Sequence, residues 1–189
     1  MARADGRRPD ELRPLKITKD FMKNSGGSCL VECGNTRLLV TANASFCVPP
    51  FLTGTERGWL TAEYAMLPAS TPQRKTRETK RPDGRSTEIG RLIGRALRCV
   101  CNLAAFPGYT VTVDCDVLDA DGGTRTAGIT GAYVALCECA ARMEAEGLLL
   151  MPLLKDGVAA VSCGIVDGEP MLDLAYPEDS RADADLNVV

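Results

Sequence analysis

The 189-residue chain contains no histidine, and this absence removes several kinds of catalytic site. Ser-His-Asp and Cys-His nucleophilic sites need an imidazole to move a proton, and so does any nuclease that uses histidine as an acid or a base. Acid–base chemistry in this protein must therefore rest on carboxylates, lysine, tyrosine or water bound to a metal.

Long apolar runs are also absent, since none approaches the roughly 20 residues that cross a bilayer. The first residues, MARADGRRPDELRP, are charged from the start and lack the apolar region of a signal peptide. We therefore expect a cytoplasmic protein without a membrane partner.

The nine cysteines include no C-x-x-C pair, and no histidine can complete a zinc site. The closest spacings are Cys-x-Cys at 99/101 and at 137/139, inside helical patterns where residues two apart do not share a face. We expect most of these cysteines to be buried small apolar side chains in a reducing compartment.

The formal net charge of the chain is only −3, but its positive charge is concentrated locally. A local basic cluster on an acidic protein is typical of a site that guides an anionic polymer, and the alternative is solvated loop charge. The densest basic cluster consists of Arg74, Lys75, Arg77, Lys80, Arg81 and Arg85.

Apolar periodicity and turn residues predict an α+β domain over residues 1–189, with helices packed on a mixed sheet. Two hairpins are expected, one across Gly34-Asn35 and one across Asp167-Gly168, and residues 69–86 are expected to form a polar loop. The predicted strands are residues 28–33, 36–45, 59–67, 108–117, 157–166 and 171–176, and the predicted helices are residues 87–103 and 124–146.

The most informative segment is DCDVLDADGGTRTAGITGA at residues 114–132, where a predicted strand runs through two glycines into a helix. Glycines let the backbone approach a ligand closely, and a helix start offers unpaired N–H groups. Thr124 and Arg125 add donors suited to a phosphate-like anion. The alternative is an ordinary strand-to-helix turn capped by Thr124.

Two further groups of residues support an anion site. Arg85 stands just ahead of the first predicted helix, where it can reach an anion held near that helix start. The acidic run from Asp173 to Asp185 follows a predicted strand, and such carboxylates can hold Mg²⁺ or act as a general acid. The alternative is a solvated acidic turn. Together the groups suggest a phosphoryl-transfer site.

Long motifs in a fixed order resemble the ribonuclease PH family, whose members are phosphate-dependent tRNA exonucleases related to exosome core subunits. The resemblance covers essentially the whole chain. The matching segments are DGRRPDELRPLKI (5–17), GWLTAEYAMLP (58–68), GRSTEIGRLIGRALR (84–98), DCDVLDADGGTRTAGITGA (114–132), AAVSCGIVDGEPMLDLAYPEDS (159–180) and DADLNVV (183–189).

The resemblance implies a ribonuclease PH-like fold of the ribosomal protein S5 domain 2-like kind. It also implies a reversible reaction in which inorganic phosphate attacks the 3′-terminal phosphodiester of RNA, such as a tRNA precursor. Each turnover would release a nucleoside diphosphate. Members of this family assemble as hexameric rings of three dimers, so a homo-oligomer is expected.

The resemblance assigns roles residue by residue. Arg85, Gly123, Thr124 and Arg125 would bind the attacking phosphate. Asp179 and Asp185 would bind Mg²⁺ and protonate the leaving 3′-oxygen. Arg74 and Arg77 would hold the tRNA 3′ end and take part in ring assembly.

The chain departs from the family pattern at two places. Ala69 stands where the family usually has a third loop arginine. The sequence stops at Val189, whereas family members continue through a further strand and C-terminal helices, so that Asp185 is expected to lie on a segment that frays. These departures leave an alternative open, in which the chain is a catalytically weak or inactive RNA-binding subunit of a ring.

Overall fold

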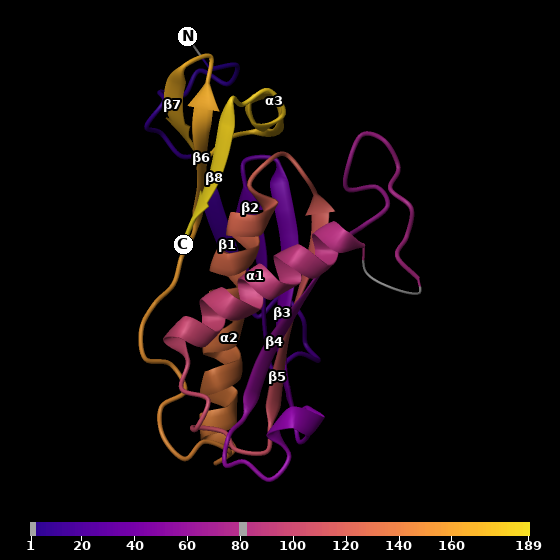
Figure 1. Cartoon of the computed structure of the whole chain (residues 1–189), viewed down its shortest axis with the longest axis vertical. Helices are drawn as coiled ribbons and strands as arrows, with labels where there is room; N and C mark the ends of the chain where they lie inside the picture. The colour runs from indigo at the N-terminus through magenta and orange to yellow at the C-terminus, as the bar shows by residue number, and fades with distance from the viewer. Residues whose placement is uncertain (1–2, 80–82) are drawn as a thin grey trace.

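The computed structural model describes residues 3–79 and 83–189, and it contains two sheets that follow one another along the long axis (Figure 1). The larger sheet has five strands in the order β1-β2-β3-β5-β4, and the smaller has three in the order β7-β6-β8. Only β4 and β5 pair in parallel; the other pairs are antiparallel. The strands are β1 (Leu15–Lys19), β2 (Gly27–Cys33), β3 (Thr36–Ser45), β4 (Trp59–Met66), β5 (Thr110–Asp119), β6 (Val161–Val166), β7 (Glu169–Leu172) and β8 (Ala184–Val188).

Two long helices, α1 (Gly84–Val100) and α2 (Thr124–Ala145), pack against the larger sheet (Figure 1). The helix α1 begins where the Asp83 carboxylate accepts a hydrogen bond from the Ser86 amide at 2.6 Å, which satisfies one of its free N–H groups. The chain also forms a 3₁₀ turn, η1 (Pro50–Leu52), and a single helical turn, α3 (Tyr176–Asp179).

The main core lies between the helices and the larger sheet. Leu38 and Val113 on neighbouring strands are fully buried against Ile93 and Leu97 of α1 and other helix residues. Burying one such side chain contributes about 1.5–3 kcal/mol relative to leaving it exposed. A second, small cluster holds the smaller sheet together around Leu174.

The structure confirms the α+β class, the mixed sheet and both hairpins predicted from the sequence. Boundaries move by a few residues: α1 begins at Gly84 rather than at residue 87, because Asp83 caps it. Lys80 and Arg81 of the predicted basic cluster lie outside the described residues. The prediction that residues 1–189 form one domain stays a prediction.

Three short elements, β1, β8 and α3, were not expected from the sequence. The strand β8 carries Asp185 and pairs with β6 along its length, so this segment is held in a sheet rather than frayed as predicted. Every residue of β8 is exposed, and such a strand has no alternation of buried and exposed side chains to reveal it.

The cysteines are less uniformly buried than predicted. Cys29, Cys101, Cys115 and Cys139 are buried, whereas Cys47 and Cys99 are exposed and the others are half-buried. Burial raises the pKa of the Cys29 thiol to about 12, so that this side chain stays protonated and unreactive. In residues 3–79 and 83–189, no helix is long and apolar enough to cross a membrane.

Candidate active site

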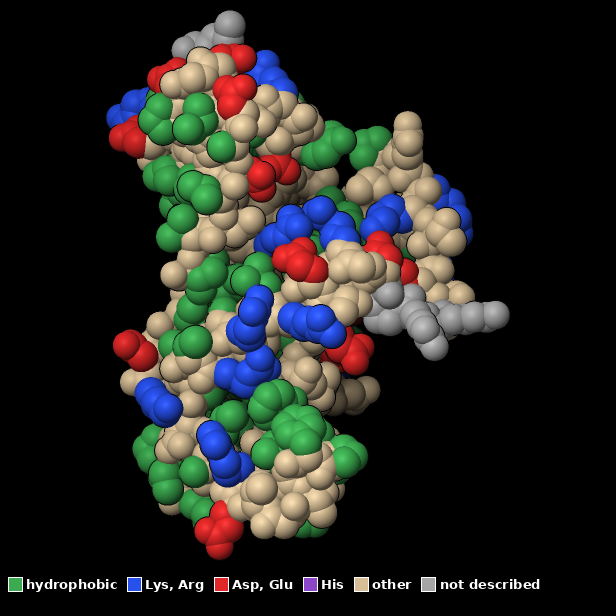
Figure 2. All heavy atoms as spheres, viewed as in Figure 1, with side chains coloured by type: hydrophobic (Ala, Val, Ile, Leu, Met, Phe, Trp, Pro, Cys, Tyr) green, Lys and Arg blue, Asp and Glu red, His purple; other side chains and the backbone are tan. Residues whose placement is uncertain are grey.

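A cavity of about 730 Å³ lies where the two sheets meet the N-termini of α1 and α2. Figure 2 shows a band of Lys and Arg side chains across the middle of this face, with Asp and Glu side chains beside it. Every site residue predicted from the sequence lines this cavity except Arg77. Arg77 is on the same loop as Arg74, between β4 and α1, but is not in the cavity wall. The predicted residues in the wall are Arg74, Arg85, Gly123, Thr124, Arg125, Asp179 and Asp185.

The glycine turn before α2 forms one wall. Gly122 and Gly123 have φ of 76° and 66°, in the left-handed region that favours glycine. A Cβ at Gly122 would also collide with the carbonyl oxygen of Leu174. Backbone conformation therefore favours glycine at both positions, and the space at Gly122 also requires it. After this turn, the free N–H groups of the α2 N-terminus lie at the cavity.

Thr124 is the first residue of α2 and is buried, and its hydroxyl lies 2.9 Å from the Tyr64 hydroxyl. Burial raises the pKa of Tyr64, so the phenol keeps its proton at neutral pH. If Tyr64 donates this hydrogen bond, the proton of the Thr124 hydroxyl is free for a ligand in the cavity.

The positive side of the cavity comes from Arg85 and Arg125, each in the first turn of its helix. Helix N-termini carry partial positive charge, so the two side chains and the two helix ends act in the same direction on an anion. The Arg125 guanidinium also forms an ion pair with Glu88, with Nη2 and Oε2 3.0 Å apart. The ion pair holds Arg125 beside the cavity, and an anion in the cavity would compete with the Glu88 carboxylate for the guanidinium.

The negative side comes from Asp179 at the end of α3 and Asp185 on β8. Desolvation raises the pKa of Asp179, and repulsion from Asp185 raises it further, while Arg85 and Arg125 act in the opposite direction. A carboxyl with a raised pKa holds a proton closer to neutral pH, which suits a general acid. The prediction that these two carboxylates act as a pair agrees with this placement.

Sequence profiles of known families match nearly all of the chain. The profile of the 3′ exoribonuclease family, domain 1, matches residues 11–141, and the profile of the same family, domain 2, matches residues 156–189. The chain belongs to the 3′ exoribonuclease family. The family resemblance inferred from the sequence motifs is thereby confirmed.

Curated relatives of this family are similar over the whole chain. Ribonuclease PH of Corynebacterium diphtheriae is 54% identical over 190 residues, which cover 100% of this chain and 79% of the relative. Ribonuclease PH of Neisseria meningitidis serogroup B is 51% identical over 185 residues, which cover 97% of this chain and 76% of the relative. Membership of the family at this identity assigns the chain its enzyme class, phosphorolytic exoribonuclease.

A solved structure of the family supports the fold. The exosome of Archaeoglobus fulgidus, with RNA bound to the active site, contains a chain that superposes with a TM-score of 0.82 at 28% identity. The match covers 98% of this chain and 75% of the archaeal chain. The ribonuclease PH-like fold expected from the resemblance is thus confirmed.

Of the described residues that line the cavity, two carry carboxylates that could bind a metal, Asp179 and Asp185. Within the described ranges, no group of three or more Cys, Asp or Glu side chains could by itself hold a metal ion. Mg²⁺, however, is commonly bound through one or two carboxylates together with water and substrate phosphates. Asp179 and Asp185, facing a site suited to phosphate, fit that mode of binding.

Several side chains in or behind the cavity wall were missed by the sequence reasoning. Tyr176 and Asn187 line the cavity, Ser162 does so with a buried hydroxyl that has no hydrogen-bond partner in the described structure, and Tyr64 supports Thr124 from behind. Tyr64, Ser162 and Asn187 belong to no charged or glycine-rich motif, and Tyr176 is an uncharged member of the acidic run, so only tertiary contacts reveal their place at the cavity.

Proposed function

We propose that this chain shortens RNA from its 3′ end by phosphorolysis, with tRNA precursors as substrates and nucleoside diphosphates as products. One observation carries the proposal. Arg85, Arg125 and residues at the α2 N-terminus line the same cavity as Asp179 and Asp185, which supports a site that holds an anion and a leaving group together.

The attacking phosphate would bind at the α2 N-terminus. N–H groups of Gly123 and Thr124, the Thr124 hydroxyl and the guanidinium groups of Arg85 and Arg125 supply donors around it. Inorganic phosphate is already an anion near pH 7, so it needs no histidine base to become a nucleophile. The enzyme must instead bring the attacking phosphate close to the anionic phosphodiester of the RNA, and the arginines offset the repulsion between them.

In the proposed reaction, a phosphate oxygen forms a bond to the phosphorus of the terminal nucleotide as the bond from that phosphorus to the preceding 3′-oxygen breaks. The departing 3′-oxygen takes up a proton, and the raised pKa of Asp179 suits it as the donor. We assign Asp185 to raising that pKa and, with Asp179, to binding Mg²⁺. A bound Mg²⁺ would neutralise charge on the phosphate oxygens.

The RNA is proposed to approach along the loop between β4 and α1. Arg74 on this loop is exposed and lines the cavity, and Arg77 is exposed nearby on the same loop. Exposed Ala69 at the start of the loop supplies no charge, so we expect a weaker hold on RNA than a third arginine would give.

Ring assembly is proposed from the similarity of this chain to chains of exosomes. The archaeal neighbour is a chain of an exosome, and another solved neighbour is an archaeal exosome core. We propose a hexameric ring of three dimers for this chain. Its cytoplasmic location stays a prediction.

The alternative of an inactive RNA-binding ring subunit is not favoured. The curated relatives that match the whole chain are named as ribonucleases. The cavity also retains the arginines, the glycine turn and both carboxylates that the reaction needs.

The proposal is tested with a tRNA precursor that carries extra 3′ nucleotides. We expect release of nucleoside diphosphates, separated by anion-exchange chromatography, only when both inorganic phosphate and Mg²⁺ are present. Release of nucleoside monophosphates without added phosphate would exclude phosphorolysis. RNA binding without any turnover at high phosphate would instead support the inactive ring subunit.

A further inference from the structure

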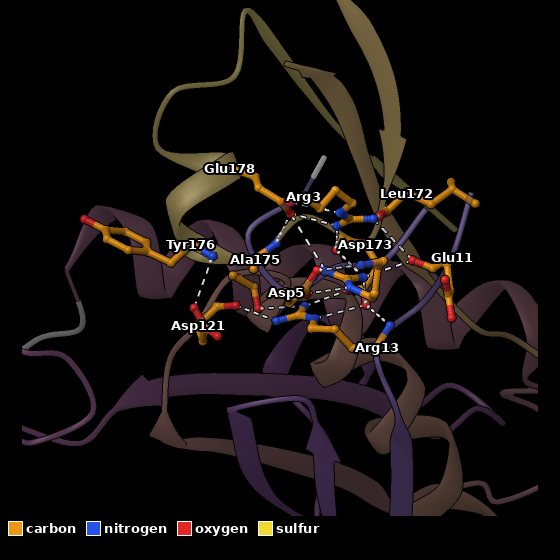
Figure 3. A network of polar contacts seen from close by, with 12 residues as sticks. Arg3, Asp5, Glu11, Arg13, Asp121, Leu172, Asp173, Ala175, Tyr176 and Glu178 are labelled. Carbon is orange, nitrogen blue, oxygen red and sulfur yellow. Dashed lines mark hydrogen bonds and ion pairs between the residues drawn. The ribbon is translucent and has the colours of Figure 1, made fainter. Parts of the chain in front are cut away.

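A buried ionic network lies behind the cavity and joins the N-terminal segment to both of its walls (Figure 3). At its centre is Asp173, whose Oδ1 accepts a hydrogen bond from Arg13 Nη2 at 2.6 Å. The Oδ2 atom accepts hydrogen bonds from Arg13 Nε at 3.0 Å and from the Arg13 backbone amide at 2.7 Å. Three donors of one residue thus grip one carboxylate.

The same guanidinium also reaches the glycine turn. Arg13 Nη1 donates to the carbonyl oxygen of Asp121 at 2.5 Å, and Nη2 donates to that of Gly122 at 3.4 Å. These carbonyls directly precede Gly123 and the free N–H groups of α2. Arg13 therefore connects Asp173 to the segment proposed to bind phosphate.

On its other side, Asp173 leads into the carboxylate wall of the cavity. Its φ is 50°, a left-handed conformation that a non-glycine residue keeps only where its surroundings enforce it. The chain continues through Leu174 into α3, which carries Asp179. Arg3 holds this helical turn from behind, with Nε and Nη2 donating to the Glu178 carboxylate at 2.8 and 2.7 Å.

The two walls also touch each other directly. The Tyr176 amide at the start of α3 donates to Asp121 Oδ1 at 3.2 Å, and Gly122 packs against the backbone of Leu174. The turn and α3 are therefore in contact. Arg13 is hydrogen-bonded both to the turn and to Asp173, which precedes α3.

We propose that Arg13 is a positioning residue that holds the phosphate-binding turn at a set distance from the Asp179 wall. It does not line the cavity and acts only through Asp173 and the turn carbonyls. This inference rests on the proposed function. A displacement of about 1 Å between reacting groups can cost on the order of 100-fold in rate, so such a support has kinetic consequences.

The test compares Arg13→Gln with Arg7→Gln. Arg7 is a matched control because it also donates to the Asp173 carboxylate, at 3.3 Å, and to the Asp173 carbonyl, at 3.1 Å, and pairs with Glu178 of α3 at 3.8 Å. Among the contacts of the described residues, it has no hydrogen bond or ion pair to the glycine turn. Both variants are expected to lower the melting temperature. Only Arg13→Gln is expected to raise the KM for phosphate, on the order of tenfold or more, and to lower kcat as well.

Hydrogen–deuterium exchange gives a readout that does not need turnover. In Arg13→Gln, amides of residues 121–125 should exchange at least about tenfold faster than in Arg7→Gln, as expected for local loss of hydrogen-bonded support of the glycine turn. Equal exchange in the two variants, or equal KM values for phosphate, would overturn the proposal. Absence of phosphorolysis in the unmodified protein would count against the proposed function, whereas the exchange measurement would still decide the positioning role.

If Arg13→Gln does not fold, Arg13→Lys carries the same comparison. Lysine keeps the charge near Asp173 but loses the forked geometry that reaches Asp121 and Gly122 at the same time. We expect Arg13→Lys to recover most of the melting temperature and little of the phosphate KM. Full recovery of both would show that Arg13 contributes charge alone, which would refute positioning.

Discussion

Replacement of Arg125 by alanine should weaken phosphorolysis strongly while leaving the fold intact. The guanidinium stands in the first turn of α2 and lines the cavity, so its loss removes one charged donor from the proposed phosphate site. Removing a single preorganised donor of this kind typically costs about 2.7–4 kcal/mol of transition-state stabilisation.

The ion pair of Arg125 in the structure lowers the expected loss of transition-state stabilisation. In the free protein its Nη2 lies 3.0 Å from Glu88 Oε2, and the Glu88 side chain is 54% exposed. An exposed pair of this kind is worth about 0.2–1 kcal/mol, which is given up when Arg125 turns to phosphate. The net loss in Arg125→Ala should then be about 2–4 kcal/mol, or roughly 30- to 900-fold in kcat/KM for phosphate.

Glu88→Gln probes the same competition from the other side. Releasing Arg125 from its ion pair should lower the KM for phosphate by up to about fivefold, equivalent to about 1 kcal/mol. The assay is the initial rate of nucleoside diphosphate release at saturating RNA over a series of phosphate concentrations. Arg57→Ala serves as the charge-matched control, because Arg57 is exposed just before β4, at the end of that strand away from the cavity.

Two results would refute this reasoning about Arg125. One is a kcat/KM for phosphate in Arg125→Ala within about twofold of that in Arg57→Ala. The other is a KM for phosphate that rises in Glu88→Gln, because that would mean the ion pair orients Arg125 for the anion instead of competing with it.

Four further substitutions test other parts of the site and its support. Asp179→Asn should abolish most of kcat, and Asp185→Asn should shift the decline of kcat at high pH to lower pH, because removing the repulsion of Asp185 lowers the pKa of Asp179. Tyr64→Phe should raise the KM for phosphate by roughly 2- to 10-fold through loss of one buried hydrogen bond, with little change in kcat. Burial alone would raise the pKa of Asp173, but the hydrogen bonds from Arg13 outweigh it and lower the pKa below its ordinary value of 3.8. The charged form of Asp173 therefore stabilises the fold above pH 3.8, and this stabilisation is lost as the pH falls through the lowered pKa. Between pH 6 and pH 2, the melting temperature of Asp173→Asn should therefore fall less steeply than that of the unmodified protein.

The larger elements were predictable because their signals are local. The β2–β3 hairpin has strongly apolar strands on either side of Gly34-Asn35, and α1 repeats apolar residues at three- and four-residue spacing. The strand β8 and the turn α3 have no such signal, since β8 is exposed along its length and α3 has only four residues. Their place depends on pairing with β6 and on the ion pair between Arg3 and Glu178.

The candidate site was predictable where charged and glycine residues stand together in the chain. The turn at Gly122 and Gly123 and the arginine after it could be singled out as a candidate anion site from their residue types, with an ordinary strand-to-helix turn as the alternative. Tyr64 could not, because it stands 60 residues from Thr124 and looks like any strand tyrosine. Arg13 and Asp173 are 160 residues apart, and no local pattern indicates that they pair.

The sequence by itself determined the class of fold, the family and the chemical groups at the site, because apolar periodicity, glycine turns and long motifs are properties of contiguous residues. Only the tertiary structure decided how these groups act on one another. The raised pKa of Asp179 arises from burial and from the nearby Asp185, and the ion pair of Arg125 and the hydrogen bonds of Arg13 to the turn arise from groups that meet only through folding. Electrostatic interaction depends on distance and on burial, and neither quantity exists until distant segments of the chain pack together.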